Sequence, residues 1–198
     1  DQKQTVSKTD TLTALNMKLL VAGDPASPGI AWGHAKVLQS AREINKLNSG
    51  EVLVAVQTNP DFVPAMKKAA AIVTERGGRT SHAAIVSREL GIPAVVGAPR
   101  ATKLLNNNIV ITVDGSSGKV YQGAPSQTQI EKIQSSTLVK KAGQTLKTKT
   151  KIYVNLASPN RVDAVAAMNV DGIGLLRAEF MIADIGVHPK KLIKEHKE

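Results

Sequence analysis

Short apolar runs alternate with polar, glycine- or proline-containing breaks along the first 124 residues. Runs that are rich in Val and Ile and are bounded by such breaks predict β-strands. The predicted strands cover residues 30–38, 52–56, 70–74, 93–96, 109–113 and 119–122. Asn59-Pro60-Asp61 predicts the start of a helix over 62–69, and apolar spacing predicts a second helix over 80–90, ended by Gly91. The pattern is that of a mixed α/β domain.

The pattern changes after residue 150. An apolar run over 152–156, an Ala- and Val-rich helix over 159–168 and a second apolar run over 172–176 predict a strand-helix-strand unit. A unit of this length cannot bury a sheet by itself, so we expect it to begin a larger domain.

Four segments follow from this reading. Residues 1–20 are a polar linker that leads into the first domain, which covers 21–124. Residues 125–150 are rich in Gln, Ser, Thr and Lys and predict an interdomain linker. Residues 151–198 are the N-terminal part of a second domain.

Composition and charge exclude several classes of protein. No apolar run approaches the length of about 18 residues that a membrane span requires. Cysteine is absent, so there is no disulfide framework or thiolate metal site, and the cytoplasm is the simplest compartment. The net charge of +10 is concentrated at 140–151 and 190–197, which favours a solvated linker and tail. With only 3% aromatic residues, a nucleic-acid-binding module is a distant alternative.

The candidate chemistry lies between Thr74 and Ala84. Two glycines leave room for a phosphate group to approach the backbone, and Thr80 and Ser81 are residue types that cap helices. His82 would then lie in the first turn of the helix, where the dipole favours a neutral ring and a bound anion. Arg76 and Arg79 can add charged hydrogen bonds to phosphate oxygens. A lone histidine at a helix start is more often a surface residue, so spacing alone leaves both readings open.

The stretch from Gly77 to Gly97, which contains Gly-Gly-Arg-Thr-Ser-His, resembles the phosphohistidine signature of the phosphoenolpyruvate-utilising enzymes. The resemblance implies that His82 is transiently phosphorylated and that the first domain is a swivelling β/β/α domain. The predicted phosphate-binding residues are Gly77, Gly78, Arg79, Thr80 and Ser81. The resemblance also implies that a regulatory kinase and phosphorylase act on Thr80, whereas a purely structural cap is the alternative.

Gly172 to Phe180 resembles the start of the family's phosphoenolpyruvate-binding (β/α)8 barrel. The resemblance implies that Arg177, directly after a predicted strand, binds substrate; an ion pair with Glu179 is the alternative. Gly186-Val187-His188-Pro189 is most similar to the phosphoenolpyruvate synthases, and we expect His188 to be structural.

The resemblance implies one reaction: ATP phosphorylates His82, which then passes the group to pyruvate, giving phosphoenolpyruvate, AMP and phosphate. This is the activity of a pyruvate, water dikinase. Pyruvate phosphate dikinase and enzyme I-like phosphotransferases are the alternatives, because they share the signature. The resemblance further implies a homodimer, and Mg²⁺ held by parts of the enzyme outside this chain. We therefore expect no metal site here and no complete reaction by this chain alone.

Overall fold

The computed structural model describes residues 17–126, 129–130, 149–156 and 162–176. The chain divides into two compact units, Asp1–Lys141 and Ala142–Glu198, and the boundary falls within the predicted linker at 125–150. Arg177 and His188 lie outside the described residues, as does most of that linker.

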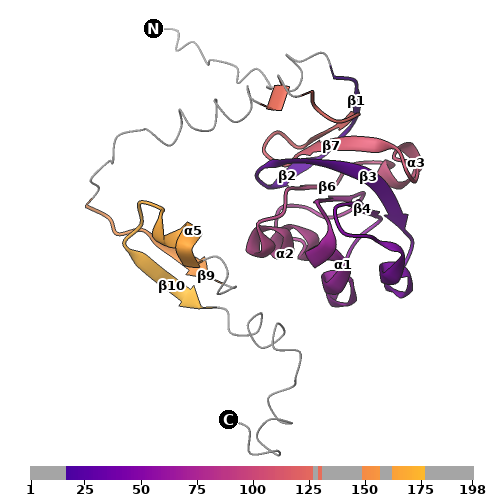
Figure 1. Cartoon of the computed structure of the whole chain (residues 1–198). Coiled ribbons are helices and arrows are strands. Elements are labelled where there is room, and N and C mark those ends of the chain that lie inside the picture. Colours follow the sequence, from indigo (N-terminus) through magenta and orange to yellow (C-terminus); the bar gives the residue numbers. More distant parts are fainter. Residues whose placement is uncertain (1–16, 127–128, 131–148, 157–161, 177–198) are drawn as a thin grey trace, which may run out of the picture. The chain divides into compact units, whose positions relative to one another are not determined.

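Eight strands form one mixed sheet in the first unit (Figure 1). Its order is β1-β8-β7-β3-β4-β5-β6-β2. The pairs from β3 to β6 are parallel and the others are antiparallel. The strands are β1 (Leu19–Ala22), β2 (Asp24–Ser27), β3 (Ile30–Leu38), β4 (Val52–Ala55), β5 (Ala71–Thr74), β6 (Ala94–Val96), β7 (Val110–Asp114) and β8 (Lys119–Gln122).

The long strand β3 joins two parts of the sheet. Its first half, Ile30 to His34, pairs with β7, and its second half, Ala35 to Leu38, pairs with β4. Alternate residues of both parts meet in one core, which contains Val52, Val54 and Val113. Because successive strand residues point to opposite faces, the parallel part has a second apolar face, which includes Leu53.

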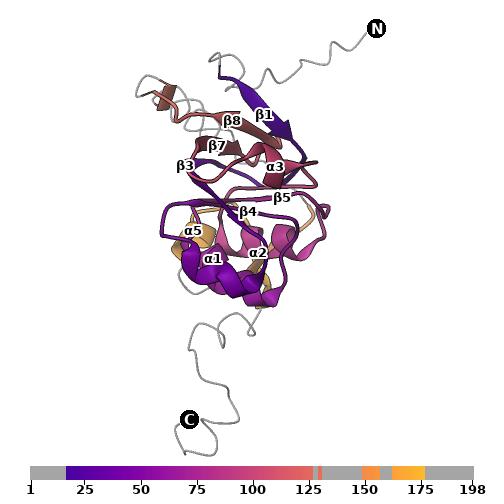
Figure 2. The ribbon, with the colours of Figure 1, turned by 90° about the vertical axis from the view of Figure 1, so that its right-hand side faces the viewer.

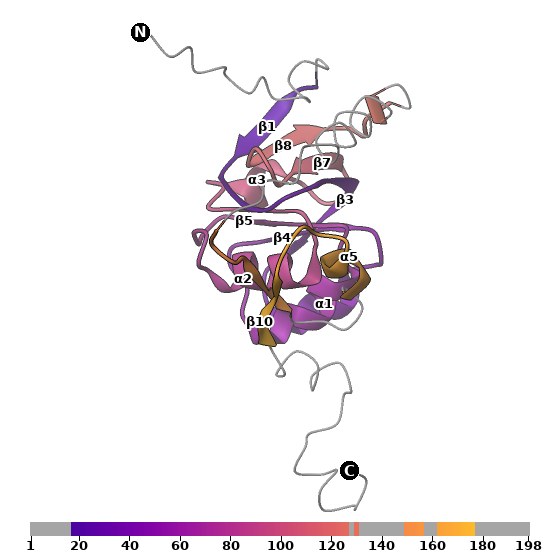
Figure 3. The same ribbon diagram turned by 90° about the vertical axis from the view of Figure 1, so that its left-hand side faces the viewer.

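Helices lie on both sides of the parallel strands. Figures 2 and 3 show α1 and α2 on one side of β4 and β5, and α3 on the other. The parallel strands of the first unit are therefore covered by helices on both faces. The helices of this unit are the 3-10 helices η2 (Ala41–Lys46) and η3 (Pro60–Phe62) and the α-helices α1 (Val63–Lys68), α2 (His82–Leu90) and α3 (Ala101–Leu104).

All six strands that the sequence predicts in the first domain are confirmed, within a residue or two at their ends, and so are the two helices. Strands β1 and β2 were not predicted. β1 starts at Leu19, inside the segment that the sequence assigns to a linker, and pairs with β8.

The carboxyl ends of β3, β4 and β5 lie at one edge of the sheet because these strands are parallel. The segments that follow them, which begin at Gln39, Val56 and Glu75, therefore leave the sheet at the same edge. In open α/β sheets this edge is where ligands bind.

The second unit is described by three elements: β9 (Tyr153–Leu156), α5 (Val162–Ala166) and β10 (Gly172–Leu176). β9 and β10 are parallel neighbours, so the predicted strand-helix-strand unit is confirmed. Tyr153, Ile173 and Leu175 are about half exposed. The barrel itself remains a prediction.

Candidate functional site

His82 is the first residue of α2. Ser81 precedes it in extended conformation (φ −69°, ψ 162°), and its Oγ accepts a hydrogen bond from the backbone N–H of Ala84 at 3.4 Å. Gly91, at φ 70°, ends the helix in the left-handed conformation that glycine adopts without strain. The predicted place of His82 in the first turn is confirmed. Ser81 is the cap, and Thr80 lies exposed before it.

The imidazole ring of His82 is held from a distant part of the sequence. Its Nδ1 lies 2.9 Å from Oγ1 of Thr58, which follows β4. The ring is half-buried, and burial lowers the pKa of His82 because it disfavours the charged imidazolium. Burial therefore favours the neutral form of the ring, the form that the sequence prediction attributed to the helix dipole.

In the loop between β5 and α2, the backbone at one position has a conformation that only glycine adopts without strain. Gly77 has φ +108°, and a Cβ added there would lie 2.8 Å from Cβ of Ser81. Gly78 has open space around the position of its missing side chain. The first glycine thus permits the tight path of the loop, and the second leaves the backbone accessible.

A cavity of about 250 Å³ opens beside His82. Arg76 is the one permanently charged residue in the lining of this cavity, and the lining contains no carboxylate. The cavity lies at the positive end of α2, whose first N–H groups have no partner within the helix. Such a cavity favours an anion. Its lining residues are Gln57, Thr58, Arg76, Gly77, Ser81, His82 and Ala83.

Of the predicted phosphate ligands, the structure brings Gly77 and Ser81 into this cavity with His82. Gly78, Arg79 and Thr80 lie beside it and are not part of its lining. The carbonyl oxygen of Arg79 accepts a hydrogen bond from Nη2 of Arg88 at 2.6 Å.

Sequence reasoning did not find Gln57 and Thr58. They lie 24 or more positions before His82, and no local spacing connects the two segments. One signal was present: polar residues directly follow the buried strand over 52–56. In a parallel sheet, such residues lie at the edge where ligands bind.

Within the described ranges, no group of three or more His, Cys, Asp or Glu residues is placed to hold a metal ion. None of the described helices is long and apolar enough to cross a membrane.

Comparison with known families agrees with this geometry. Residues 47–118, which include His82 and Thr58, match the mobile domain of the PEP-utilising enzymes. Residues 131–197 match the PEP-binding domain of the same enzymes. The chain belongs to the PEP-utilising enzyme family.

Within that family, the chain is similar to phosphoenolpyruvate synthases. It is 51% identical over 184 residues to the phosphoenolpyruvate synthase of Pyrococcus furiosus, a match that covers 91% of this chain and 22% of that protein. It is 43% identical over 190 residues to the probable phosphoenolpyruvate synthase of Methanothermobacter thermautotrophicus, covering 96% of this chain and 28% of that protein. The chain thus spans less than a third of the length of these relatives.

Among solved structures, the chain is similar to a solution NMR structure of an Enzyme I protein. That match has 32% sequence identity and a TM-score of 0.40, and it covers 49% of this chain and 40% of the other.

Proposed function

We propose that His82 carries a phosphoryl group from ATP to pyruvate, in a reaction that consumes ATP, pyruvate and water and gives phosphoenolpyruvate, AMP and phosphate. One observation carries the proposal. The His82 ring, held at Nδ1 by Thr58, faces a cavity whose lining contains a guanidinium group and no carboxylate. The similarity to phosphoenolpyruvate synthases supports ATP and pyruvate as the two substrates.

Thr58 determines which ring nitrogen reacts. When Nδ1 carries the proton and donates it to Oγ1 of Thr58, the lone pair of Nε2 is free to attack phosphorus. The opposite tautomer would place a proton on Nε2 and block the attack. We therefore assign Nε2 as the nucleophile, and burial of the ring keeps it in the neutral form that can react.

The same surroundings stabilise the phosphorylated ring. Arg76 can donate charged hydrogen bonds to phosphoryl oxygens in the cavity. The N-terminus of α2 adds backbone N–H groups and the positive end of the helix dipole. Transfer through histidine divides one reaction between ATP and pyruvate into two simpler displacements.

The second half-reaction needs a site for pyruvate. The resemblance implies that Arg177 binds this substrate in the barrel, and that the first unit swivels through the linker at 125–150 to reach it. The homodimer and regulatory phosphorylation of Thr80 belong to the same proposal. The exposed position of Thr80, next to the cap residue, is compatible with access by a kinase. A phosphate there would repel one arriving at His82.

A chimera provides the test. This chain would replace the matching segment of the Pyrococcus furiosus phosphoenolpyruvate synthase, with which it shares 51% identity. We expect the chimera to form phosphoenolpyruvate from ATP and pyruvate, and the His82→Ala variant to form none. His34→Ala, which changes another histidine of the first unit, is the matched control and retains activity. Phosphoenolpyruvate formation by the folded His82→Ala chimera would refute the proposal, and a requirement for orthophosphate would indicate a dikinase instead.

A further inference from the structure

A second cavity, of about 320 Å³, lies beside the His82 cavity. Gln57, Thr58 and Arg76 line both cavities. The second cavity extends from these residues toward Gln39 and Ser40, which follow β3. The two cavities therefore lie side by side along the edge where β3, β4 and β5 end.

The lining of the second cavity suits an anion. Its polar side chains are uncharged apart from Arg76, and no carboxylate takes part in it. Carboxylates close in sequence to its lining residues already have partners. Glu75, whose carboxylate also interacts with the charge of Arg76, accepts a hydrogen bond from the backbone N–H of Thr102 at 2.8 Å. Asp61 accepts a hydrogen bond from Nδ2 of Asn59, and Glu43 accepts one from the backbone N–H of Gln39 at 2.8 Å.

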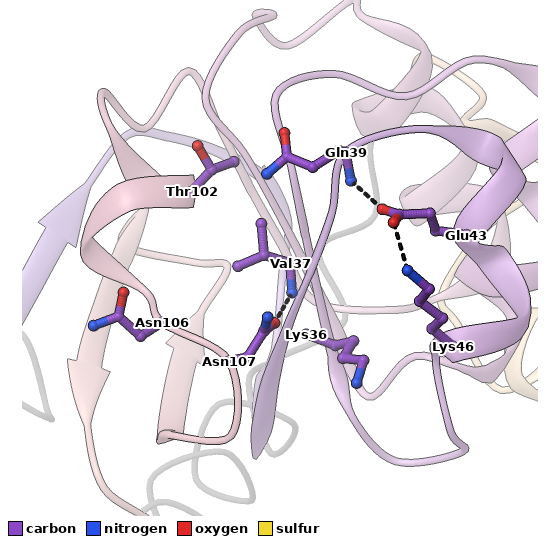
Figure 4. Close-up of a pocket in the computed structure, with 8 residues that line it drawn as sticks. All are labelled: Lys36, Val37, Gln39, Glu43, Lys46, Thr102, Asn106 and Asn107. Atoms are coloured by element: carbon purple, nitrogen blue, oxygen red, sulfur yellow. Dashed lines mark hydrogen bonds and ion pairs between the residues drawn. The ribbon is translucent and has the colours of Figure 1, made fainter.

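Gln39 also lines a neighbouring pocket of the first unit, together with Glu43 and Thr102, and Figure 4 shows it from that side. Its backbone N–H bonds to Glu43, which is also bridged to Lys46 at 2.6 Å, while the Gln39 side chain extends away from both. The side-chain amide of Gln39 forms no hydrogen bond with the other described residues, so it is available to a ligand.

Arg76 stands between the two cavities on a fixed backbone. Its N–H donates to the carbonyl oxygen of Val56 at 2.8 Å, and its own carbonyl oxygen accepts from Oγ1 of Thr74 at 2.9 Å. Its guanidinium forms no hydrogen bond or ion pair with the other described residues. A guanidinium has five N–H donors in a planar fork, enough to contact two neighbouring anionic groups.

We propose that the second cavity is a subsite for the leaving phosphate of a phosphoanhydride donor, bridged by Arg76 to the phosphoryl group at His82. This inference rests on the proposed function and adds to it. In this proposal the first unit binds a second phosphate of the donor, in addition to the group that is transferred to His82.

Phosphoryl transfer to His82 would begin in the first cavity. Nε2 of His82 attacks the phosphorus in the first cavity, so that an N–P bond forms and the P–O bond of the anhydride breaks. With ATP as the donor, the electron pair of that bond goes to the oxygen that becomes part of AMP, so that Nε2 carries a diphosphoryl group whose terminal phosphate lies in the second cavity. Water then attacks the terminal phosphorus and the P–O–P bond breaks, so that this phosphate leaves and the first phosphoryl group stays on Nε2. The ring keeps its proton on Nδ1, bonded to Thr58, and Arg76 offsets the new negative charge.

The test measures ion binding by the whole chain with NMR at constant ionic strength, from the shifts of the His82 ring and of the cavity amides. The probes are orthophosphate, inorganic diphosphate and phosphoenolpyruvate. We expect diphosphate to bind about tenfold more tightly than orthophosphate, a difference of about 1.4 kcal/mol. Gln39→Glu, which places a carboxylate at the second cavity and outside the lining of the His82 cavity, should remove this preference and leave orthophosphate binding unchanged. Arg76→Gln should weaken both.

Two controls address general electrostatic attraction. Lys18→Gln removes the same charge as Arg76→Gln, and Gln122→Glu adds the same charge as Gln39→Glu. Lys18 and Gln122 are exposed and lie outside both linings. These controls should keep the diphosphate preference. If they abolish it as well, the attraction is non-specific and the subsite is refuted.

The remaining outcomes separate the subsite from the proposed function. Equal binding of the two ions, with His82 shifts present, would refute the subsite and leave the carrier role of His82 intact. A Gln39-dependent preference for phosphoenolpyruvate over diphosphate would refute the assignment to a phosphoanhydride. Absence of any His82 shift with either ion would contradict both the subsite and the phosphate site next to His82.

Discussion

The hydrogen bond between Thr58 and His82 is the contact that makes this histidine differ from an ordinary residue at a helix start. It holds Nδ1 of the ring at Thr58, and so leaves Nε2 as the ring nitrogen that is available to a substrate. Burial adds the second requirement, since a neutral ring is the reactive form. Both requirements lead to predictions for single side chains.

Thr58→Val should slow phosphorylation of His82 in the chimera by roughly tenfold to a hundredfold, because the isosteric side chain cannot hold the ring in place. Thr58→Ser keeps the hydroxyl group and should restore most of the rate. The measurement is the rate of phosphohistidine formation from ATP, with thermal unfolding as the control for folding. An unchanged rate in the folded Val variant would show that the bond has no role in catalysis.

The pH dependence of His82 follows from its lowered pKa. In the folded chain the ring should titrate below its ordinary value of about 6.5, as measured by NMR of the ring carbons. Between the folded and the unfolded pKa, the unfolded chain binds more protons, so the free energy of unfolding rises with pH in this range. His82→Gln should reduce that rise. A ring that titrates at or above 6.5 would contradict burial as the controlling influence.

At the scale of elements, the sequence predicted the strands and helices whose form depends on local patterning. The buried parallel strands are continuous apolar runs because both of their faces are covered, and α2 has a capping serine and a terminal glycine. The two strands that were not predicted, β1 and β2, are the edges of the sheet. An edge strand needs less apolar surface and tolerates proline, as β2 does at Pro25. The approach of Thr58 to His82 depends on strand order, which local patterning does not contain.

The loop into α2 supplies a prediction on stability. Gly77→Ala should lower the free energy of unfolding by roughly 1–3 kcal/mol, because φ is +108° and the new Cβ would meet Ser81. Gly78→Ala is the matched control: it adds the same methyl group into open space and should change stability by about 0.5 kcal/mol or less. Denaturant unfolding of both variants is the measurement. Equal effects would contradict the described path of the loop.

At the scale of the whole molecule, the chain joins a unit that carries His82 and matches the mobile domain of the PEP-utilising enzymes to a second unit that matches their PEP-binding domain. The sequence pattern predicts a first domain over 21–124 and a second domain that begins at residue 151. The proposed carrier role requires that the first unit meet the ATP site and the pyruvate site in turn, and the linker at 125–150 is the segment that would allow it.

Phosphoryl labelling of His82 tests the central claim most directly. The chimera would be incubated with ATP labelled at the β-phosphate, without pyruvate, and the label mapped by peptide. The account predicts an acid-labile, base-stable label on the His82 peptide, which disappears when pyruvate is added and reappears in phosphoenolpyruvate. A folded, ATP-binding chimera with no label on His82 would contradict the account.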